Sequence, residues 1–426
     1  MKYFLLPLGC ATNKADAERI AAVLESIGYE KANSEEEANL VGIVACSIRQ
    51  SAIDRVYGKV HKWNKRKNTE HLITFVSGCI LPTDEKKFLK TFDIVLKIDQ
   101  IYTLPSLLKE YGTALPQSFW EIAPKRTSTF TALVPIQNGC NKFCTYCAVP
   151  YTRGKEVSRP SSEILAEIKQ LIDAGYKQMT LLGQNVNSYG LDKPKNEISF
   201  AELLRCIGEM GDASDRRLWV HYTSPHPQDM TEEVLDVQAQ YNSLAKYLNL
   251  PLQSGNNDVL KKMNRRYTRE KYMQLLDAAH AKMPGLTVST DIIVGFCGET
   301  EEQFQDTVTA MQRGKYDLAF IAQYSPRPGA MAERRFEDSV PKSIKKEREK
   351  RLTEILKETA LQNNKKIVGT TIPVLVETHS RKSGKMLGRT EGLKSIEFVG
   401  NSSTIGNFVQ ITITDCDAWR LYGTLA

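Results

Sequence analysis

The chain has 426 residues, of which 41% are hydrophobic and 25% are charged, an ordinary composition for folded globular domains. At roughly 150 residues per domain, this length predicts about three domains. Nine cysteines are too few for a disulfide scaffold and indicate reduced thiols in a cytoplasmic protein. No apolar run reaches the roughly 18 residues that a membrane helix needs, so no membrane partner is expected. The net charge of +7 mildly favours an anionic partner.

Short apolar runs alternate with amphipathic segments in the first domain, which we assign to residues 1–115. Strands are predicted at 3–8, 40–45, 72–76 and 93–96, with helices between them. This alternation predicts an α/β fold with a doubly wound parallel sheet. Right-handed crossovers would then place the carboxyl ends of all these strands along one edge.

Three cysteines follow the first three predicted strands, namely Cys10, Cys46 and Cys79. A lone cysteine is usually a small buried apolar residue. Three cysteines at the same topological position instead suit soft metal chemistry, either an iron–sulfur cluster or zinc. Glycine precedes Cys10 and Cys79, and it would let the backbone approach a bulky ligand closely.

The strand–helix alternation restarts with a longer period in the middle domain, which we assign to residues 126–360. Six β/α units fit an incomplete (β/α)6 barrel better than a closed eightfold one. Active residues are then expected at the carboxyl ends of the strands. The predicted strands cover 133–137, 179–183, 218–222, 247–250, 287–294 and 318–324.

Three closely spaced cysteines follow the first of these strands, in the sequence Cys140-Asn-Lys-Phe-Cys144-Thr-Tyr-Cys147. Such a CxxxCxxC triplet can bind three irons of a [4Fe–4S] cube and leave the fourth iron open to another ligand. A zinc site would need a fourth protein ligand, and His221 and His226 are remote in sequence.

The triplet, with the aromatic Tyr146 before its last cysteine, resembles the signature of radical S-adenosylmethionine (SAM) enzymes. The resemblance extends along essentially the whole chain and is strongest to the methylthiotransferase branch that modifies isopentenylated adenosine in tRNA. The segments that carry it are 140–160, Gly183-Gln-Asn-Val-Asn-Ser-Tyr-Gly190, Leu250-Pro-Leu-Gln-Ser-Gly255, 290–301 and Tyr324-Ser-Pro-Arg-Pro-Gly329.

This resemblance implies two [4Fe–4S] clusters and S-adenosylmethionine as cofactors. Cys140, Cys144 and Cys147 would hold the radical-generating cluster, and Cys10, Cys46 and Cys79 an auxiliary cluster. One SAM molecule would donate a methyl group to sulfur, and a second would give the 5′-deoxyadenosyl radical. Cofactor-binding residues are then expected mainly at strand ends, namely Tyr146, Gln184, Asn185, Asn187, Ser254, Asp291 and Gly295.

The last domain, residues 361–426, changes to short β segments and predicts a small OB-like barrel. The segment Gly388-Arg-Thr-Glu-Gly-Leu-Lys394 resembles a loop of the TRAM domain, an RNA-binding module. Lys385, Arg389 and Lys394 are therefore expected to contact RNA phosphates. Arg153 is assigned to RNA as well, although the carboxylate of the cofactor is an equally suitable partner for it.

The resemblance thus implies methylthiolation at C2 of N6-isopentenyladenosine at position 37 of tRNA, with the anticodon stem-loop as the partner. A flavodoxin or ferredoxin is expected as the reductant, and the protein is expected to be a cytoplasmic monomer. The alternatives are a sibling methylthiotransferase, acting on another tRNA adenosine derivative or a ribosomal-protein Asp, and a cluster-carrying RNA-binding or electron-transfer protein.

Overall fold

The computed structural model describes residues 1–47, 50–67, 69–108, 122, 124–380 and 383–426. The predicted domain boundary at residue 115 lies outside the described residues. The chain forms two compact units, which are described one at a time. The first comprises residues 1–128, 133–159 and 327–334, and the second comprises 129–132, 160–326 and 335–426.

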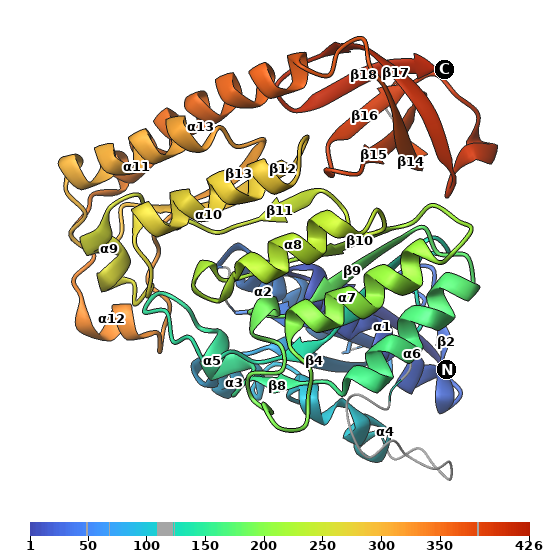
Figure 1. Cartoon of the computed structure of the whole chain (residues 1–426). Helices are drawn as coiled ribbons and strands as arrows, with labels where there is room; N and C mark the ends of the chain where they lie inside the picture. Colours follow the sequence, from blue (N-terminus) through green and yellow to red (C-terminus); the bar gives the residue numbers. More distant parts are fainter. Residues whose placement is uncertain (48–49, 68, 109–121, 123, 381–382) are drawn as a thin grey trace. The chain divides into compact units, whose positions relative to one another are not determined.

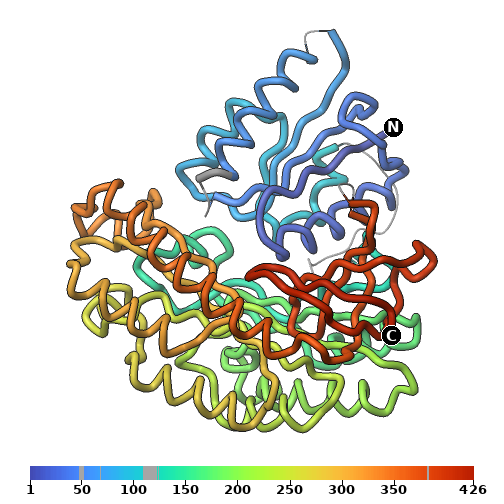
Figure 2. The backbone as a smooth tube through the Cα atoms, turned by 90° about the horizontal axis from the view of Figure 1, so that it is seen from above, coloured from blue at the N-terminus to red at the C-terminus, as the bar shows by residue number. Residues whose placement is uncertain are grey.

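A parallel sheet of five strands forms the centre of the first unit, in the order β2-β1-β3-β4-β5 (Figure 2, blue). Strand β3 is buried throughout, and its side chains point alternately into two apolar clusters, one on each face of the sheet. Leu40 and Val44 pack with helix α1, whereas Val41 and Ile43 pack with helix α2. Both faces are therefore covered by helices, as the doubly wound fold predicts.

The elements of this sheet are short, and helices follow strands β1, β3 and β4 directly. They are β1 (Lys2–Pro7), α1 (Ala11–Ser26), β2 (Glu30–Lys31), β3 (Leu40–Cys46), α2 (Gln50–Arg66), β4 (Ile73–Cys79), α3 (Pro82–Phe88), β5 (Ile94–Val95), η1 (Ile98–Thr103) and α4 (Leu104–Leu107).

The first unit also contains a loop region with short elements: β7 (Gln137–Asn138), α5 (Val149–Thr152) and β8 (Val157–Ser158). Strands β7 and β8 pair antiparallel and close the segment that carries the CxxxCxxC triplet. Strand β6 (Thr131–Pro135) leads into this segment, and α12 (Met331–Arg335) contributes a backbone hydrogen bond from Ala332 N to Thr145 O at 2.7 Å.

Parallel strands and long helices alternate in the second unit, as expected for an incomplete (β/α)6 barrel (Figure 1). Strand β9 pairs with β10, and β11 pairs with β12, which pairs with β13. Threonine or serine caps begin four of the helices by accepting a backbone N–H, which satisfies a donor that the helix itself leaves open. The elements are α6 (Ser161–Asp173), β9 (Gln178–Leu182), η3 (Val186–Ser188), α7 (Phe200–Asp212), β10 (Trp219–Tyr222), η4 (Pro227–Asp229), α8 (Glu232–Gln240), β11 (Tyr247–Asn249), α9 (Asn257–Lys262), α10 (Arg269–Lys282), β12 (Thr287–Val294), α11 (Glu301–Gly314), β13 (Leu318–Gln323) and α13 (Lys342–Lys365).

A closed five-stranded barrel ends the chain, in the order β14-β15-β16-β18-β17. Its interior is filled by apolar side chains such as Val374, Ile396 and Ile411, so the OB-like prediction is confirmed. The strands are β14 (Thr371–His379), β15 (Met386–Thr390), β16 (Ser395–Phe398), β17 (Phe408–Cys416) and β18 (Arg420–Leu425), with η5 (Ser402–Thr404) before β17. No described helix combines the length and the apolar character needed to cross a membrane.

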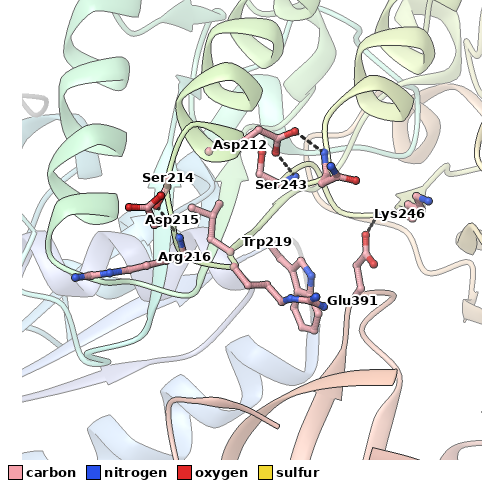
Figure 3. A pocket seen from close by; sticks show the side chains of 12 residues that line it. Asp212, Ser214, Asp215, Arg216, Trp219, Ser243, Lys246 and Glu391 are labelled. Atoms are coloured by element: carbon pink, nitrogen blue, oxygen red, sulfur yellow. Dashed lines mark hydrogen bonds between the residues drawn. The ribbon is translucent and has the colours of Figure 1, made fainter. Parts of the chain in front are cut away.

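The small barrel rests on the parallel strands of the same unit through its loop at residues 390–394. His221 is buried, and its Nε2 donates to the carbonyl oxygen of Glu391 at 2.8 Å. The Glu391 carboxylate accepts the backbone N–H of Lys246 at 2.8 Å beside a cavity of about 480 Å³ (Figure 3). Trp219 packs edge-on against Phe408 with ring centres 4.6 Å apart. The barrel is thus joined to the strands by both polar and apolar contacts.

Candidate functional site

The first three cysteines lie at the carboxyl ends of neighbouring strands in the first unit. Cys46 and Cys79 are the last residues of β3 and β4, and the strand register places them directly opposite each other. Cys10 follows β1 and is the residue before helix α1. Cys46 and Cys79 are buried, while Cys10 is half-buried. The fold therefore brings these three segments to one edge of the sheet.

The backbone packs closely around these cysteines, and two glycines make this packing possible. A Cβ atom on Gly9 would lie 2.9 Å from the Cβ of Cys46, and one on Gly78 would lie 2.5 Å from the carbonyl oxygen of Ala45. Asn13 joins two of the segments, because its Nδ2 donates to Ala45 O at 2.9 Å and its Oδ1 accepts the N–H of Cys10 at 3.2 Å. Nothing in the sequence marks Asn13 for this role.

Buried hydroxyl groups flank the second and third cysteines. Ser47 Oγ and Ser77 Oγ have no hydrogen-bond partner within the part of the chain that the structure describes. Burying an unpaired hydroxyl is costly, so such groups in a folded protein call for a partner. The inorganic sulfides and thiolate sulfurs of an iron–sulfur cluster are hydrogen-bond acceptors of this kind. The donor set at this edge therefore fits such a cluster.

The CxxxCxxC triplet lies in a tightly folded loop of the same unit. Cys140 and Cys144 are buried, and Cys147 is half-buried. The N–H of Cys140 donates to Gly154 O at 3.3 Å, and the N–H of Cys147 donates to Cys144 O at 2.9 Å. Gly139 has φ +82°, and a Cβ there would lie 2.1 Å from the carbonyl oxygen of Lys155, so only glycine fits.

Burial raises the pKa of the Cys140 thiol to about 11, and the neighbouring Cys144 raises it further. The Cys140 thiol would have to lose its proton on binding metal, because the thiolate is the form that ligates a cluster. Among the described residues, no three His, Cys, Asp or Glu side chains are grouped so as to hold one metal ion. A [4Fe–4S] cube instead spreads its cysteines over separate irons. Tyr146 is half-buried beside Cys147 in the sequence.

The predicted cofactor-binding amides lie in the second unit, directly after strand β9. The side chain of Asn187 is bonded at both polar atoms to the loop after β10. Its Nδ2 donates to His226 O at 3.0 Å, and its Oδ1 accepts the N–H of His226 at 2.7 Å. Asn185 donates to Asp229 at 2.7 Å, whereas its Oδ1 is buried and has no partner among the described residues. Gln184 is half-buried next to it. Among the described residues, Asn185 Oδ1 is thus without a partner, whereas both polar side-chain atoms of Asn187 are bonded.

The remaining predicted cofactor residues also differ in what they can offer. Ser254 is fully buried, and its Oγ accepts the N–H of Asn256 at 3.2 Å, so in this structure it does not reach an open surface. Asp291 is half-buried and accepts from Asn249 Nδ2 at 3.2 Å. Gly295 has φ +67°, and its N–H donates to Glu299 at 2.7 Å.

Arg153, predicted to contact RNA, has a buried side chain with protein partners in this structure. Its guanidinium is buried against Asp16 at 2.5 Å and donates to Cys79 Sγ at 2.9 Å and Asn138 Oδ1 at 3.0 Å. All of these contacts lie inside the first unit, and they favour a structural role for Arg153 over the predicted contact with RNA. Asp16 was missed from the sequence, where nothing distinguishes it from other helix residues.

The predicted RNA-binding residues of the small barrel fall into two groups. Lys385 is exposed and Arg389 is half-buried, and both make long ion pairs, to Glu397 at 3.5 Å and to Glu377 at 3.4 Å. Arg389 Nη1 also donates to the carbonyl oxygen of Leu393 at 3.1 Å. Lys394 is instead largely buried, with its Nζ 2.6 Å from Asp317 and 2.7 Å from Asn364 Oδ1. Lys394 thus joins the small barrel to the neighbouring elements of the second unit, which favours a structural role over the predicted contact with RNA.

Three family comparisons match separate parts of the chain. Residues 2–98 match the uncharacterized protein family UPF0004, residues 134–311 match the radical SAM superfamily, and residues 365–426 match the TRAM domain. The middle match contains the CxxxCxxC loop. The chain thus carries a radical SAM domain, with a further domain before it and another after it in the sequence.

Curated relatives match along the full length. The tRNA-2-methylthio-N(6)-dimethylallyladenosine synthase of Clostridium tetani is 38% identical over 441 residues, covering 99% of this chain and 95% of the relative. The enzyme of the same name from Oceanobacillus iheyensis is 37% identical, covering 100% of this chain and 84% of the relative. The chain belongs to this family of radical SAM methylthiotransferases, whose cofactors are SAM and [4Fe–4S] clusters.

Solved structures agree on the fold. The radical SAM methyltransferase TsrM from Kitasatospora setae, solved with cobalamin and a [4Fe–4S] cluster, superposes with a TM-score of 0.58 at 14% identity, covering 78% of this chain and 77% of that chain. The cobalamin-dependent radical SAM enzyme OxsB gives 0.55 at 14% identity, covering 85% and 56%. At this identity the likeness concerns architecture alone.

Proposed function

We propose that this protein methylthiolates C2 of N6-isopentenyladenosine at position 37 of tRNA, next to the anticodon. The observation that carries the proposal is the match of nearly the whole chain to curated synthases of that activity. The TRAM match at the carboxyl end supports an RNA substrate over a ribosomal protein. We further propose that the protein works as a cytoplasmic monomer and takes electrons from a flavodoxin or ferredoxin.

The six cysteines of the first unit would divide into two sets of ligands. Cys140, Cys144 and Cys147 would hold the cluster that binds SAM, and the set formed by Cys10, Cys46 and Cys79 would hold the auxiliary cluster. When bound, these groups supply a hydrogen-abstracting radical and the sulfur that enters the product. The protein supplies position and surroundings for that chemistry.

Side chains at the strand ends of the second unit would orient the cofactor. The buried Oδ1 of Asn185 is a suitable acceptor for the ammonium group of its methionine part. Asp229 supports this role, because its bond to Asn185 Nδ2 fixes which end of the amide is free. Asp291 is a suitable acceptor for the adenosine part. Ser254 and Asn187 would instead shape the loops that carry these groups.

RNA binding would rest on cations of the small barrel whose side chains remain accessible to solvent, and we assign it to Lys385 and Arg389. Phosphate contacts of this kind supply affinity without reading sequence. The target base would be read elsewhere, since chemistry on a base requires that it leave the stack.

The test uses protein reconstituted anaerobically with iron and sulfide and incubated with reductant, SAM and tRNA. Nucleosides are then analysed by mass spectrometry. We expect the methylthio product only from tRNA that carries isopentenyladenosine. Cys144→Ala should abolish it, whereas Cys206→Ala should not, because Cys206 lies on helix α7 outside both sets. Product from threonylcarbamoyl-adenosine tRNA or from a ribosomal protein, with none from the isopentenyl substrate, would overturn the proposal.

A further inference from the structure

Arg153 connects the two cysteine-bearing regions within the first unit. Its side chain is only 2% exposed, and that of its partner Asp16 is 1% exposed. Its Nε donates to the sulfur of Cys79 at 2.9 Å, while its Nη2 donates to Asp16 at 2.5 Å. Nη1 donates to Asn138 at 3.0 Å. Each nitrogen of the guanidinium thus has its own acceptor, and one of these acceptors is a predicted cluster ligand.

The charge of this arginine is compensated locally. Burial by itself would lower the pKa of Arg153, but Asp16 and Cys79 together raise it above the ordinary range, so the guanidinium stays charged. A buried cation without a partner would be strongly destabilising, and Asp16 removes that penalty. Asp16 lies on helix α1, which begins directly after Cys10. The ion pair therefore ties Arg153 to the segments of two predicted auxiliary ligands.

The backbone of Arg153 belongs to the loop of the CxxxCxxC triplet. Arg153 directly precedes Gly154, whose carbonyl oxygen accepts the N–H of Cys140 at 3.3 Å. The N–H of Arg153 closes the short helix α5 by donating to Val149 O at 2.9 Å. Because these backbone hydrogen bonds hold Arg153 in place, its side chain is positioned toward Cys79 more firmly than that of a surface arginine would be.

We propose that Arg153 is a positioning residue for the auxiliary cluster and that its hydrogen bond to Cys79 raises the reduction potential of that cluster. Asp16 limits this effect, because its negative charge compensates part of the positive charge beside the Cys79 sulfur. The inference rests on the proposed function in one respect, namely that Cys79 is a cluster ligand. Hydrogen bonds to ligand sulfurs and nearby positive charge both stabilise the more negative, reduced cluster and so raise its potential.

The two partners can be changed so that the potential moves in opposite directions. Asp16→Asn keeps the side-chain shape and leaves the positive charge of Arg153 uncompensated, so the potential should rise. The double change Asp16→Asn with Arg153→Gln removes both charges and the Nε donor, so the potential should fall. We expect each to alter the one-electron equilibrium about tenfold, or about 59 mV. Lys155→Gln, which removes an exposed charge two residues away, should change nothing.

The measurement is a redox titration followed by electron paramagnetic resonance on the full-length chain. Cys140, Cys144 and Cys147 are replaced by Ala in every sample, so that only the auxiliary cluster remains. Opposite shifts in the two variants support the inference, and equal potentials in all samples overturn it while leaving the proposed function intact. Absence of any bound iron in this background would instead refute the assignment of Cys79 and with it the proposed function. If the Asp16→Asn variant, with its uncompensated buried cation, is insoluble, the sign of the shift in the double variant alone decides.

Discussion

Cys46 and Cys79 stand opposite each other at the last paired position of β3 and β4, which run parallel and in register from the pair Leu40 and Ile73 onward. Parallel register makes neighbouring strands end together, so two cysteines 33 residues apart in the sequence face the same edge. The pKa of Cys79 is raised, first by its hydrogen bond with Cys46 and then by burial. The two sulfurs therefore already share one environment.

Replacing Cys10, Cys46 and Cys79 together by Ala should remove about four of the roughly eight irons of the reconstituted protein, because each set of three cysteines holds one cube. SAM should still be cleaved to 5′-deoxyadenosine, but no methylthio group should be installed. Iron analysis and product assays check this. An unchanged iron count would show that these cysteines are ordinary core residues.

Gly139→Ala should selectively damage the loop of the CxxxCxxC triplet. Its φ is +82°, and the added Cβ would lie 2.1 Å from a backbone oxygen that has no freedom to move away. We expect loss of about four irons with the auxiliary cluster retained. Gly154→Ala is the matched comparison, since its φ of +76° is similar but nothing lies within 4 Å of the new Cβ. It should cost only about 1 kcal/mol of stability and leave the iron count unchanged.

Arg389→Ala should lower the salt dependence of tRNA binding by about one unit of slope, because an exposed phosphate contact releases condensed counterions. Lys394→Gln should leave the slope unchanged, because the Lys394 Nζ is already bonded to Asp317 and Asn364. Fluorescence anisotropy with an anticodon stem-loop across a salt series measures both. Equal slopes for Arg389→Ala and the unaltered protein would contradict the assignment of this face to RNA.

His221 should make the stability of the second unit depend on pH. Burial lowers its pKa from 6.5 to about 4, against the opposing bond to Glu391. Between these values the unfolded chain binds a proton that the folded chain does not, so stability is complete above pH 6.5 and falls as the pH drops toward 4. The loss at pH 5 relative to pH 8 should be about 2 kcal/mol.

Urea unfolding followed by tryptophan fluorescence at the two pH values measures this loss. His221→Gln keeps a donor for the Glu391 carbonyl but cannot titrate, so its stability should lose that part of the pH dependence. A pH dependence identical to that of the unaltered protein would show that another group is responsible.

Periodicity in the sequence was sufficient to predict the architecture. Strand β3 could be placed because its residues are continuously apolar, and the helices because apolar residues recur at helical spacing. The small barrel could be placed from its short β segments. The sequence also predicted that Cys46 and Cys79 lie side by side, because both follow parallel strands and only the strand order decides whether those strands are neighbours.

Side-chain partners could not be predicted in the same way. Arg153 and Lys394 look alike in sequence as cations near motif residues, yet each is buried against one acid, Asp16 or Asp317. Those acids lie on distant segments, and nothing local marks them as partners. Ser254 illustrates the same point, because its hydroxyl lies 3.4 Å from that of Thr307, a residue on a segment distant in the sequence. Whether the remaining cofactor residues touch SAM stays a prediction.

The bond between His221 and Glu391 joins positions 170 residues apart in the chain. During synthesis, the ring of His221 therefore leaves the ribosome long before its acceptor does. Until then the apolar surface around Trp219 and Ala245, which Leu375 and Phe408 later cover, remains open to water and to other chains. We expect nascent chains that stop before the small barrel to need chaperones and to aggregate without them. Docking of the small barrel would then be the step that completes folding of the second unit.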